Sequence, residues 1–384
     1  MPEKISTIFI EKFNSSPLIV RSPGRINIIG EHTDYNDGFV LPAAIDKGIN
    51  IAVDKSGDNL IRLYAVNFNE HFEISLADIA PQENWPTYVL GVVDQLIKRG
   101  CKIEGFNMVI DGDVPVGAGL SSSAAVECAV AFALNELFDL KLTRIEMVHI
   151  AQKAEHTYSG VLCGIMDMFA SMFGKKDQVI KLDCRSLEYE YKPLVLDGYK
   201  LVLLNTNVKH SLASSAYNER RQQCEQGVAW VKEFYPQVNS LRDIDLQMLE
   251  KHVAAKDQLV YTRCRYVIEE IQRLQDACID LENGNIQALG QKMFATHLGL
   301  SRDYAVSCTE LDFLIEAVEN NAAVPGARMM GGGFGGCTIN IIKENSVDEV
   351  VEKLSKKYQQ AMNLQLTPII VNIEDGTSII KHNN

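Results

Sequence analysis

Short apolar runs alternate with amphipathic stretches along the first half of the chain. Residues 121–137 and 144–156 carry apolar positions at helical spacing, and residues 1–13 predict an amphipathic helix. Between these segments lie runs with the length and β-branched content of strands. The predicted strands are residues 18–22, 25–30, 50–54, 61–68 and 106–114.

The second half of the chain is dominated by helical patterning. Two further strands precede a mostly helical stretch from about Ser211 to Asn320, and a strand, a helix and a strand close the chain. These elements are residues 178–183, 199–208, 337–343, 347–362 and 367–374. The composition shifts near residue 186, which predicts an N-terminal domain over 1–186 and a C-terminal domain over 187–384. The predicted fold class is α+β.

Composition and charge narrow the class of protein. With 384 residues, 46% of them hydrophobic, the chain can bury a large core, and two domains are expected. A formal charge of −13 argues against nucleic acid or an anionic membrane as partner, because both need a basic face. No apolar run reaches the ~20 residues of a membrane span. Nine scattered cysteines without a C-x-x-C pair fit reduced thiols, so we expect a soluble cytoplasmic protein.

A glycine-rich turn, GAGLSSS at 117–123, runs into the predicted helix that follows. Backbone N–H groups and the helix dipole converge at such a turn, which favours binding of an anion. The turn lacks the lysine of a Walker A loop. It also mimics the glycine fingerprint of a dinucleotide-binding fold. That fold needs a parallel strand after the helix, whereas a second helix is expected here, so nicotinamide binding is only the runner-up.

A second glycine cluster, GARMMGGGFGGC at 326–337, precedes a predicted strand. The glycines fit either a plain hairpin turn or a place where backbone approaches a ligand closely.

Polar side chains crowd a third segment, EHTDYN at 31–36, after a short apolar strand. Closely spaced carboxylates and an imidazole suit a sugar, whose hydroxyls each donate and accept hydrogen bonds. A solvated polar turn and a metal site built from His32 and Asp34 are the alternatives.

Taken together, the three segments resemble the GHMP kinase superfamily and, within it, the galactokinase family. The run GRINIIGEHTDYNDGFVLP is similar to the galactokinase signature, the turn at 117–123 to the superfamily phosphate loop, and the second glycine cluster to its third motif. The resemblance covers essentially the whole chain and includes VLCGIMDMFAS at 161–171. It implies a two-domain fold of mixed sheets packed with helices, with the active site at the domain interface. It also implies transfer of the ATP γ-phosphoryl group to the C1 hydroxyl of galactose, with Mg²⁺ as cofactor.

The resemblance assigns roles to individual residues. Asp167 matches the catalytic aspartate and Arg25 the arginine beside it; Ser123 and Glu155 match the magnesium ligands. The sugar-binding matches are Glu31, His32, Thr33, Asp34, Gly164 and Tyr217. The ATP-binding matches are Gly117, Ala118, Gly119, Leu120, Ser121, Ser122 and Ser123, with Trp85 and Tyr88 near the adenine, although either aromatic residue could equally belong to the core.

Two positions depart from the family pattern GVPCGIMDQF. Leu162 stands in place of the proline, and Met168 in place of the glutamine after Asp167. Neither change removes a charged catalytic group. A kinase for N-acetylgalactosamine or another sugar, and a regulator that binds galactose and ATP without turnover, are the alternatives within the resemblance. We expect a monomer, with an oligomer left open.

Overall fold

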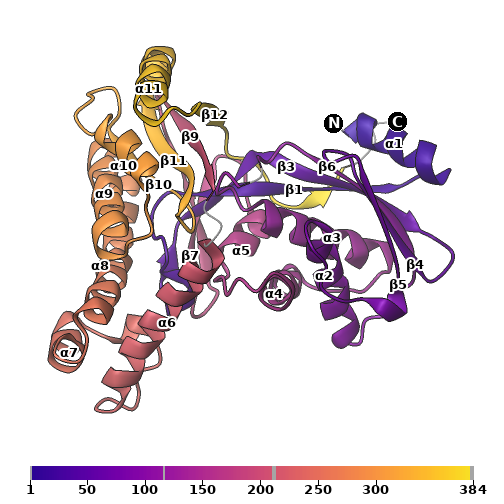
Figure 1. The fold of residues 1–384 in the computed structure, drawn as a ribbon, viewed down its shortest axis with the longest axis horizontal. Helices are drawn as coiled ribbons and strands as arrows, with labels where there is room; N and C mark the ends of the chain where they lie inside the picture. The colour runs from indigo at the N-terminus through magenta and orange to yellow at the C-terminus, as the bar shows by residue number, and fades with distance from the viewer. Residues whose placement is uncertain (1, 116, 210–212, 381–384) are drawn as a thin grey trace.

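The computed structural model describes residues 2–115, 117–209 and 213–380, and Figure 1 shows two sheet-containing halves side by side. The N-terminal half is built on a six-stranded sheet of order β13-β1-β3-β6-β4-β5. All neighbouring strands in it are antiparallel except β4 and β6. Its strands are β1 (Leu18–Asn27), β3 (Pro42–Lys55), β4 (Leu60–Ala65), β5 (Glu70–Ser75), β6 (Phe106–Gly112) and β13 (Ser378–Ile379).

Helices cover both faces of this sheet because its central strands are apolar on both sides. On β3, Ile51 and Val53 join the main core, whereas Ala52 between them packs with the N-terminal helix on the opposite face. Helices α3 and α5 contact β1 and β3 directly, and α2 and α4 pack on α3 (Figure 1). The helices are α1 (Pro2–Phe13), α2 (Pro86–Lys98), α3 (Ser122–Leu137), α4 (Arg144–Ala154) and α5 (Met166–Phe173).

The C-terminal half contains an antiparallel sheet of order β10-β11-β9-β12. Helices α9 and α10 pack on this sheet, and α8 packs between α6 and α9. Its strands are β9 (Tyr199–Lys209), β10 (Gly326–Met329), β11 (Gly335–Lys343) and β12 (Thr367–Val371). Its helices are α6 (Ala213–Lys232), α7 (Leu246–Leu249), α8 (Gln258–Glu282), α9 (Ile286–Leu298), α10 (Thr309–Glu316) and α11 (Val347–Met362). A third, three-stranded sheet joins β2 (Phe39–Val40), β7 (Gln178–Asp183) and β8 (Tyr189–Pro193).

Most predicted elements are present, and the differences are of three kinds. The two strands predicted at 18–22 and 25–30 form the single strand β1, which ends at Asn27 and shifts register between Pro23 and Arg25. The sequence does not predict strands β2, β5, β8, β10 and β13 or helices α2 and α5. The long helical stretch is divided into α6 to α10; its predicted start, Ser211, lies outside the described residues.

The predicted domain boundary at residue 186 stays a prediction, but strand pairing crosses it twice. Strand β8 lies after the boundary and pairs with β7, and the C-terminal strand β13 pairs with β1. Val20 and Arg21 in β1 face Ile379 and Ser378, which extends the N-terminal sheet by an edge strand. A division along the sequence alone therefore does not follow the sheets.

Two expectations from the sequence concern membrane-spanning helices and the state of the cysteines. No helix within the described ranges is long and apolar enough to cross a membrane. All nine cysteines are free thiols.

Candidate active site

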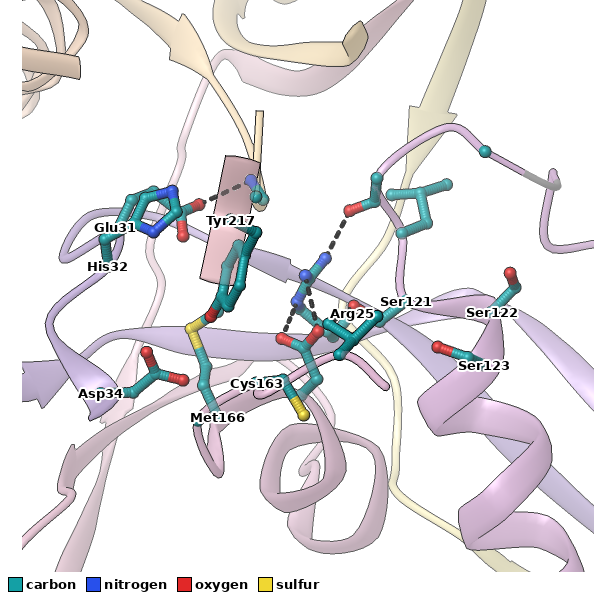
Figure 2. Close-up of a pocket in the computed structure, with 18 residues that line it drawn as sticks. Arg25, Glu31, His32, Asp34, Ser121, Ser122, Ser123, Cys163, Met166 and Tyr217 are labelled. Atoms are coloured by element: carbon teal, nitrogen blue, oxygen red, sulfur yellow. Dashed lines mark hydrogen bonds and ion pairs between the residues drawn. The ribbon is translucent and has the colours of Figure 1, made fainter. Parts of the chain in front are cut away.

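A cavity of about 240 Å³ lies where the two halves of the molecule meet. Figure 2 shows Arg25 between the serines at the start of α3 and the side chains of Tyr217, His32 and Asp34. The three motifs found in the sequence therefore share one cavity. The lining residues are Arg25, Glu31, His32, Asp34, Gly117, Gly119, Leu120, Ser121, Ser122, Ser123, Val161, Cys163, Gly164, Met166, Asp167, Tyr217, Gly331 and Gly332.

Arg25 and Asp167 form a two-point ion pair at the centre of this cavity. Arg25 Nε donates to Asp167 Oδ1 at 2.7 Å, and Nη2 donates to Oδ2 at 3.0 Å. The hydroxyl of Ser121 also donates to Oδ2. Burial lowers the pKa of Arg25, but the charges of Asp167 and Glu31 outweigh it and raise that pKa, so the guanidinium stays charged. The pair fixes one carboxylate and one cation in a defined orientation.

The glycine-rich turn before α3 takes the backbone conformation of an anion cradle. Gly117 and Gly119 have φ values of +78° and +74°, and Ser121, at the N-cap of α3, has φ 54°. A non-glycine residue in the left-handed region is strained, and such strain gathers at functional sites. Arg25 Nη1 donates to the carbonyl of Gly119 at 2.5 Å, which ties the turn to the ion pair. The turn and the N-terminus of α3 can bind phosphate oxygens.

His32 and Asp34 form the polar end of the cavity. Burial lowers the pKa of His32 to about 4, so its imidazole is neutral at neutral pH. Its Nδ1 lies 2.8 Å from the hydroxyl of Tyr35, and its Nε2 has no hydrogen-bond partner within the described residues. Burial, followed by repulsion from Asp167, raises the pKa of Asp34 to about 7. Both groups can exchange hydrogen bonds with hydroxyls.

A buried ion pair holds Glu31 in place. Arg328 in β10 is fully buried and its Nη1 lies 3.0 Å from Glu31 Oε1. The same guanidinium donates to the carbonyls of Ile28 and Asn27. The backbone N–H of Gly331 donates to Glu31 Oε1 at 2.8 Å. The second glycine cluster thus makes the β10–β11 hairpin and also brings its backbone to the cavity.

Two predicted sugar-binding residues close the polar end. Tyr217 reaches in from α6, and its ring lies 5.2 Å from the ring of His32. At Gly164, a Cβ would lie 1.9 Å from Asp34 Oδ2, so only glycine lets the chain pass so close to that carboxyl.

Five of the predicted residues do not line the cavity. Thr33 is buried, and its hydroxyl donates to the carbonyls of Gly30 and Phe39, which shapes the loop. Ala118 is also buried. Trp85 Nε1 donates to Glu70 Oε2 at 2.7 Å. The remaining two are Tyr88 and Glu155. Burial, followed by the charge of the nearby Glu155, raises the pKa of Tyr88 to about 12.

Glu155 and Glu127 form a buried pair of carboxyl groups. Glu155 lies in a π-helical turn, η3 (Glu155–Ser159), where Ser159 donates to its Oε1 at 2.7 Å. Its Oε2 and both carboxyl oxygens of Glu127 are buried, and the two carboxyl groups lie close to each other. Burial, and then the proximity of Glu155, raise the pKa of Glu127 well above its usual value. Carboxylate oxygens are preferred ligands of a hard divalent cation, so Glu155 stays a candidate metal ligand.

The sequence analysis assigned no role to Arg328 or Glu127. Arg328 lies in the second glycine cluster and Glu127 in an apolar helix, and a charged residue within a buried strand or helix was the available signal. Cys163, in the loop before α5, and Met166, the first residue of α5, also line the cavity.

Three family models match the chain. They are the galactokinase galactose-binding signature over residues 7–55, the GHMP kinases N terminal domain over 87–175 and the GHMP kinases C terminal domain over 268–360.

Full-length relatives and solved structures agree with these matches. The chain is 40% identical to the galactokinase of Clostridium acetobutylicum over 99% of this chain and 98% of the relative. It is also 40% identical to that of Thermosipho africanus, over 94% and 99%. The crystal structure of Lactococcus lactis galactokinase complexed with galactose superimposes with a TM-score of 0.94 at 33% identity, covering 99% of this chain and all of that one. A mevalonate kinase, at 18% identity and a TM-score of 0.64 over 93% and 99% of the two chains, shares the fold.

Proposed function

Because the chain belongs to the galactokinase family of GHMP kinases, we propose that it transfers the γ-phosphoryl group of ATP to the C1 hydroxyl of α-D-galactose. The products are galactose 1-phosphate and ADP. The observation that carries the proposal is the Arg25–Asp167 pair, which lies in one cavity with both the phosphate turn and the sugar signature.

The two ends of the cavity would bind different substrates. Glu31, His32 and Asp34 would bind the sugar hydroxyls, and Tyr217 would cover the ring from the C-terminal half. Backbone N–H groups of the turn at 117–123 would bind the β- and γ-phosphate oxygens. In this arrangement the sugar C1 hydroxyl faces the terminal phosphate, which supplies the proximity that phosphoryl transfer needs.

Asp167 would accept the proton of the C1 hydroxyl as the bond from O1 to phosphorus forms. The bond from phosphorus to the bridging oxygen breaks, and its electron pair leaves with ADP. Arg25 balances the charge on Asp167 and on the transferring group, and Ser121 orients the carboxylate.

The chain offers ligands that fit Mg²⁺. Ser123 lines the cavity, and the carboxyl group of Glu155 is buried beside that of Glu127, outside the lining of the cavity. Bound Mg²⁺ would neutralise charge on the phosphate oxygens of ATP. Ser123 and Glu155 would hold it, with Glu127 as the neighbouring carboxyl.

An assay of ADP release tests the proposal. We expect turnover that requires both galactose and Mg²⁺, and little turnover with N-acetylgalactosamine or without sugar. Asp167→Asn should lower kcat roughly a hundred- to ten-thousandfold while ATP still binds, because the variant keeps the shape and loses the base. Asp197→Asn, at an exposed position outside the cavity, is the matched control. Binding of both ligands with no ADP release would instead favour the regulator.

A further inference from the structure

A loop of the N-terminal half, residues 160–164, is held by two side chains of helix α6. Asn218 Oδ1 accepts from the N–H of Leu162 at 3.0 Å, and Asn218 Nδ2 donates to the carbonyl of Gly160 at 3.0 Å. Arg221 Nη1 donates to the carbonyl of Leu162 at 2.8 Å. Both backbone polar groups of Leu162 are therefore bound to the C-terminal half.

The first of these bonds depends on the backbone N–H of Leu162. A proline at this position would have no N–H to donate, so the bond to Asn218 could not form.

The loop and the helix both carry residues of the sugar end of the cavity. Cys163 and Gly164 of the loop line it, and Gly164 lies against the carboxyl of Asp34. Tyr217 directly precedes Asn218 on α6. Its ring packs on those of His32 and Tyr35, and the ring centroids of Tyr217 and Tyr35 lie 5.5 Å apart.

Arg221 adds a contact on the same side. Its guanidinium lies 5.9 Å from the ring of Tyr35, whose hydroxyl is 2.8 Å from His32 Nδ1. Glu225 accepts from Arg221 Nε at 2.9 Å and so orients the guanidinium toward the loop.

We propose that Asn218 and Arg221 are positioning residues that set the shape of the sugar end of the cavity. They hold the loop against α6, and so keep Tyr217 at a fixed distance from Gly164 and Asp34. Their hydrogen bonds go to the loop and to Glu225, and not to the phosphate turn or Asp167, so they act on sugar affinity and not on ATP affinity. This inference rests on the proposed function and identifies how the chain fixes its sugar pocket.

Calorimetric titration of galactose, without nucleotide, tests the inference separately from catalysis. We expect Asn218→Ala and Arg221→Ala to weaken galactose binding about tenfold, because each removes bonds that order the loop. Asn218→Asp keeps the acceptor for Leu162 and should lose about threefold, and Arg221→Lys should recover part of the loss. Affinity for ATP and the melting temperature should stay close to wild type. Gln222→Ala, an exposed position on the same helix, is the matched control.

A double-mutant cycle gives the sharpest test. Leu162→Pro should weaken galactose binding in the wild-type background and have little further effect with Asn218→Ala, because the acceptor is already gone. Equal effects of Leu162→Pro in both backgrounds would overturn the inference. So would galactose affinity within twofold of wild type in both alanine variants, or a parallel loss of galactose and ATP affinity. Absence of galactose binding in the wild-type protein would contradict the proposed function itself.

Discussion

Removing Arg328 tests whether a buried ion pair holds the sugar signature to the C-terminal sheet. The guanidinium has no exposed surface, and Glu31 is 1% exposed. In Arg328→Met the carboxylate of Glu31 stays buried without its cation, and the carbonyls of Asn27 and Ile28 lose their donors. Breaking one side of a buried pair typically costs about 3–5 kcal/mol. Since folded domains are stable by roughly 5–15 kcal/mol, the loss is a large fraction of the total.

A second substitution separates charge burial from lost packing. Glu31→Gln removes the charge and keeps an oxygen that can accept from Gly331. In the Arg328→Met background it should therefore restore about 1–3 kcal/mol, because no ion is left unpaired. Urea unfolding followed by circular dichroism gives the free energies for both single variants and the double variant. The reasoning would be refuted if the free energy of unfolding of the double variant were no higher than that of Arg328→Met. It would also be refuted if that of Arg328→Met lay within about 1 kcal/mol of wild type.

Three further variants test other parts of the site. Asp34→Asn should raise the melting temperature more at pH 8 than at pH 5: a carboxyl pKa raised to about 7 from 3.8 destabilises the fold as pH rises between those values, and the amide removes that cost. Equal shifts at both pH values would contradict this. Gly164→Ala should raise the KM for galactose at least tenfold, because the added Cβ meets the Asp34 carboxyl at 1.9 Å; an unchanged KM would show that the loop adapts. Glu155→Gln should raise the Mg²⁺ concentration for half-maximal rate about tenfold or more while calorimetric galactose affinity stays constant. An unaltered metal titration would remove Glu155 from the ligand set.

The sequence predicts the elements whose patterns are local. Strands such as β3, β6, β9 and β11 are apolar runs, and helix α3 follows its glycine turn as expected. The pairing of β13 with β1 was not predictable, because two exposed residues near the end of the chain carry no pattern of their own. Helix α2 was overlooked although Pro86 at its start is a favourable first helical residue.

In the candidate site, too, local patterns are visible in the sequence and long-range contacts are not. The resemblance to the galactokinase family assigned Arg25, His32 and Asp167 to one site, and all three line the same cavity. The supporting contacts join residues that are hundreds of positions apart, as between Arg328 and Glu31. Only the fold brings such pairs together. The same holds for Glu127, whose neighbour Glu155 belongs to another helix.

The proposed mechanism depends on a single arrangement of two ligands, and a crystal structure of the ternary complex with galactose and a non-hydrolysable ATP analogue would observe it. We predict the C1 hydroxyl within hydrogen-bond distance of Asp167, and the terminal phosphate between it and the turn at 117–123. Galactose bound with C1 facing away from Asp167, or the triphosphate bound outside this cavity, would contradict the mechanism.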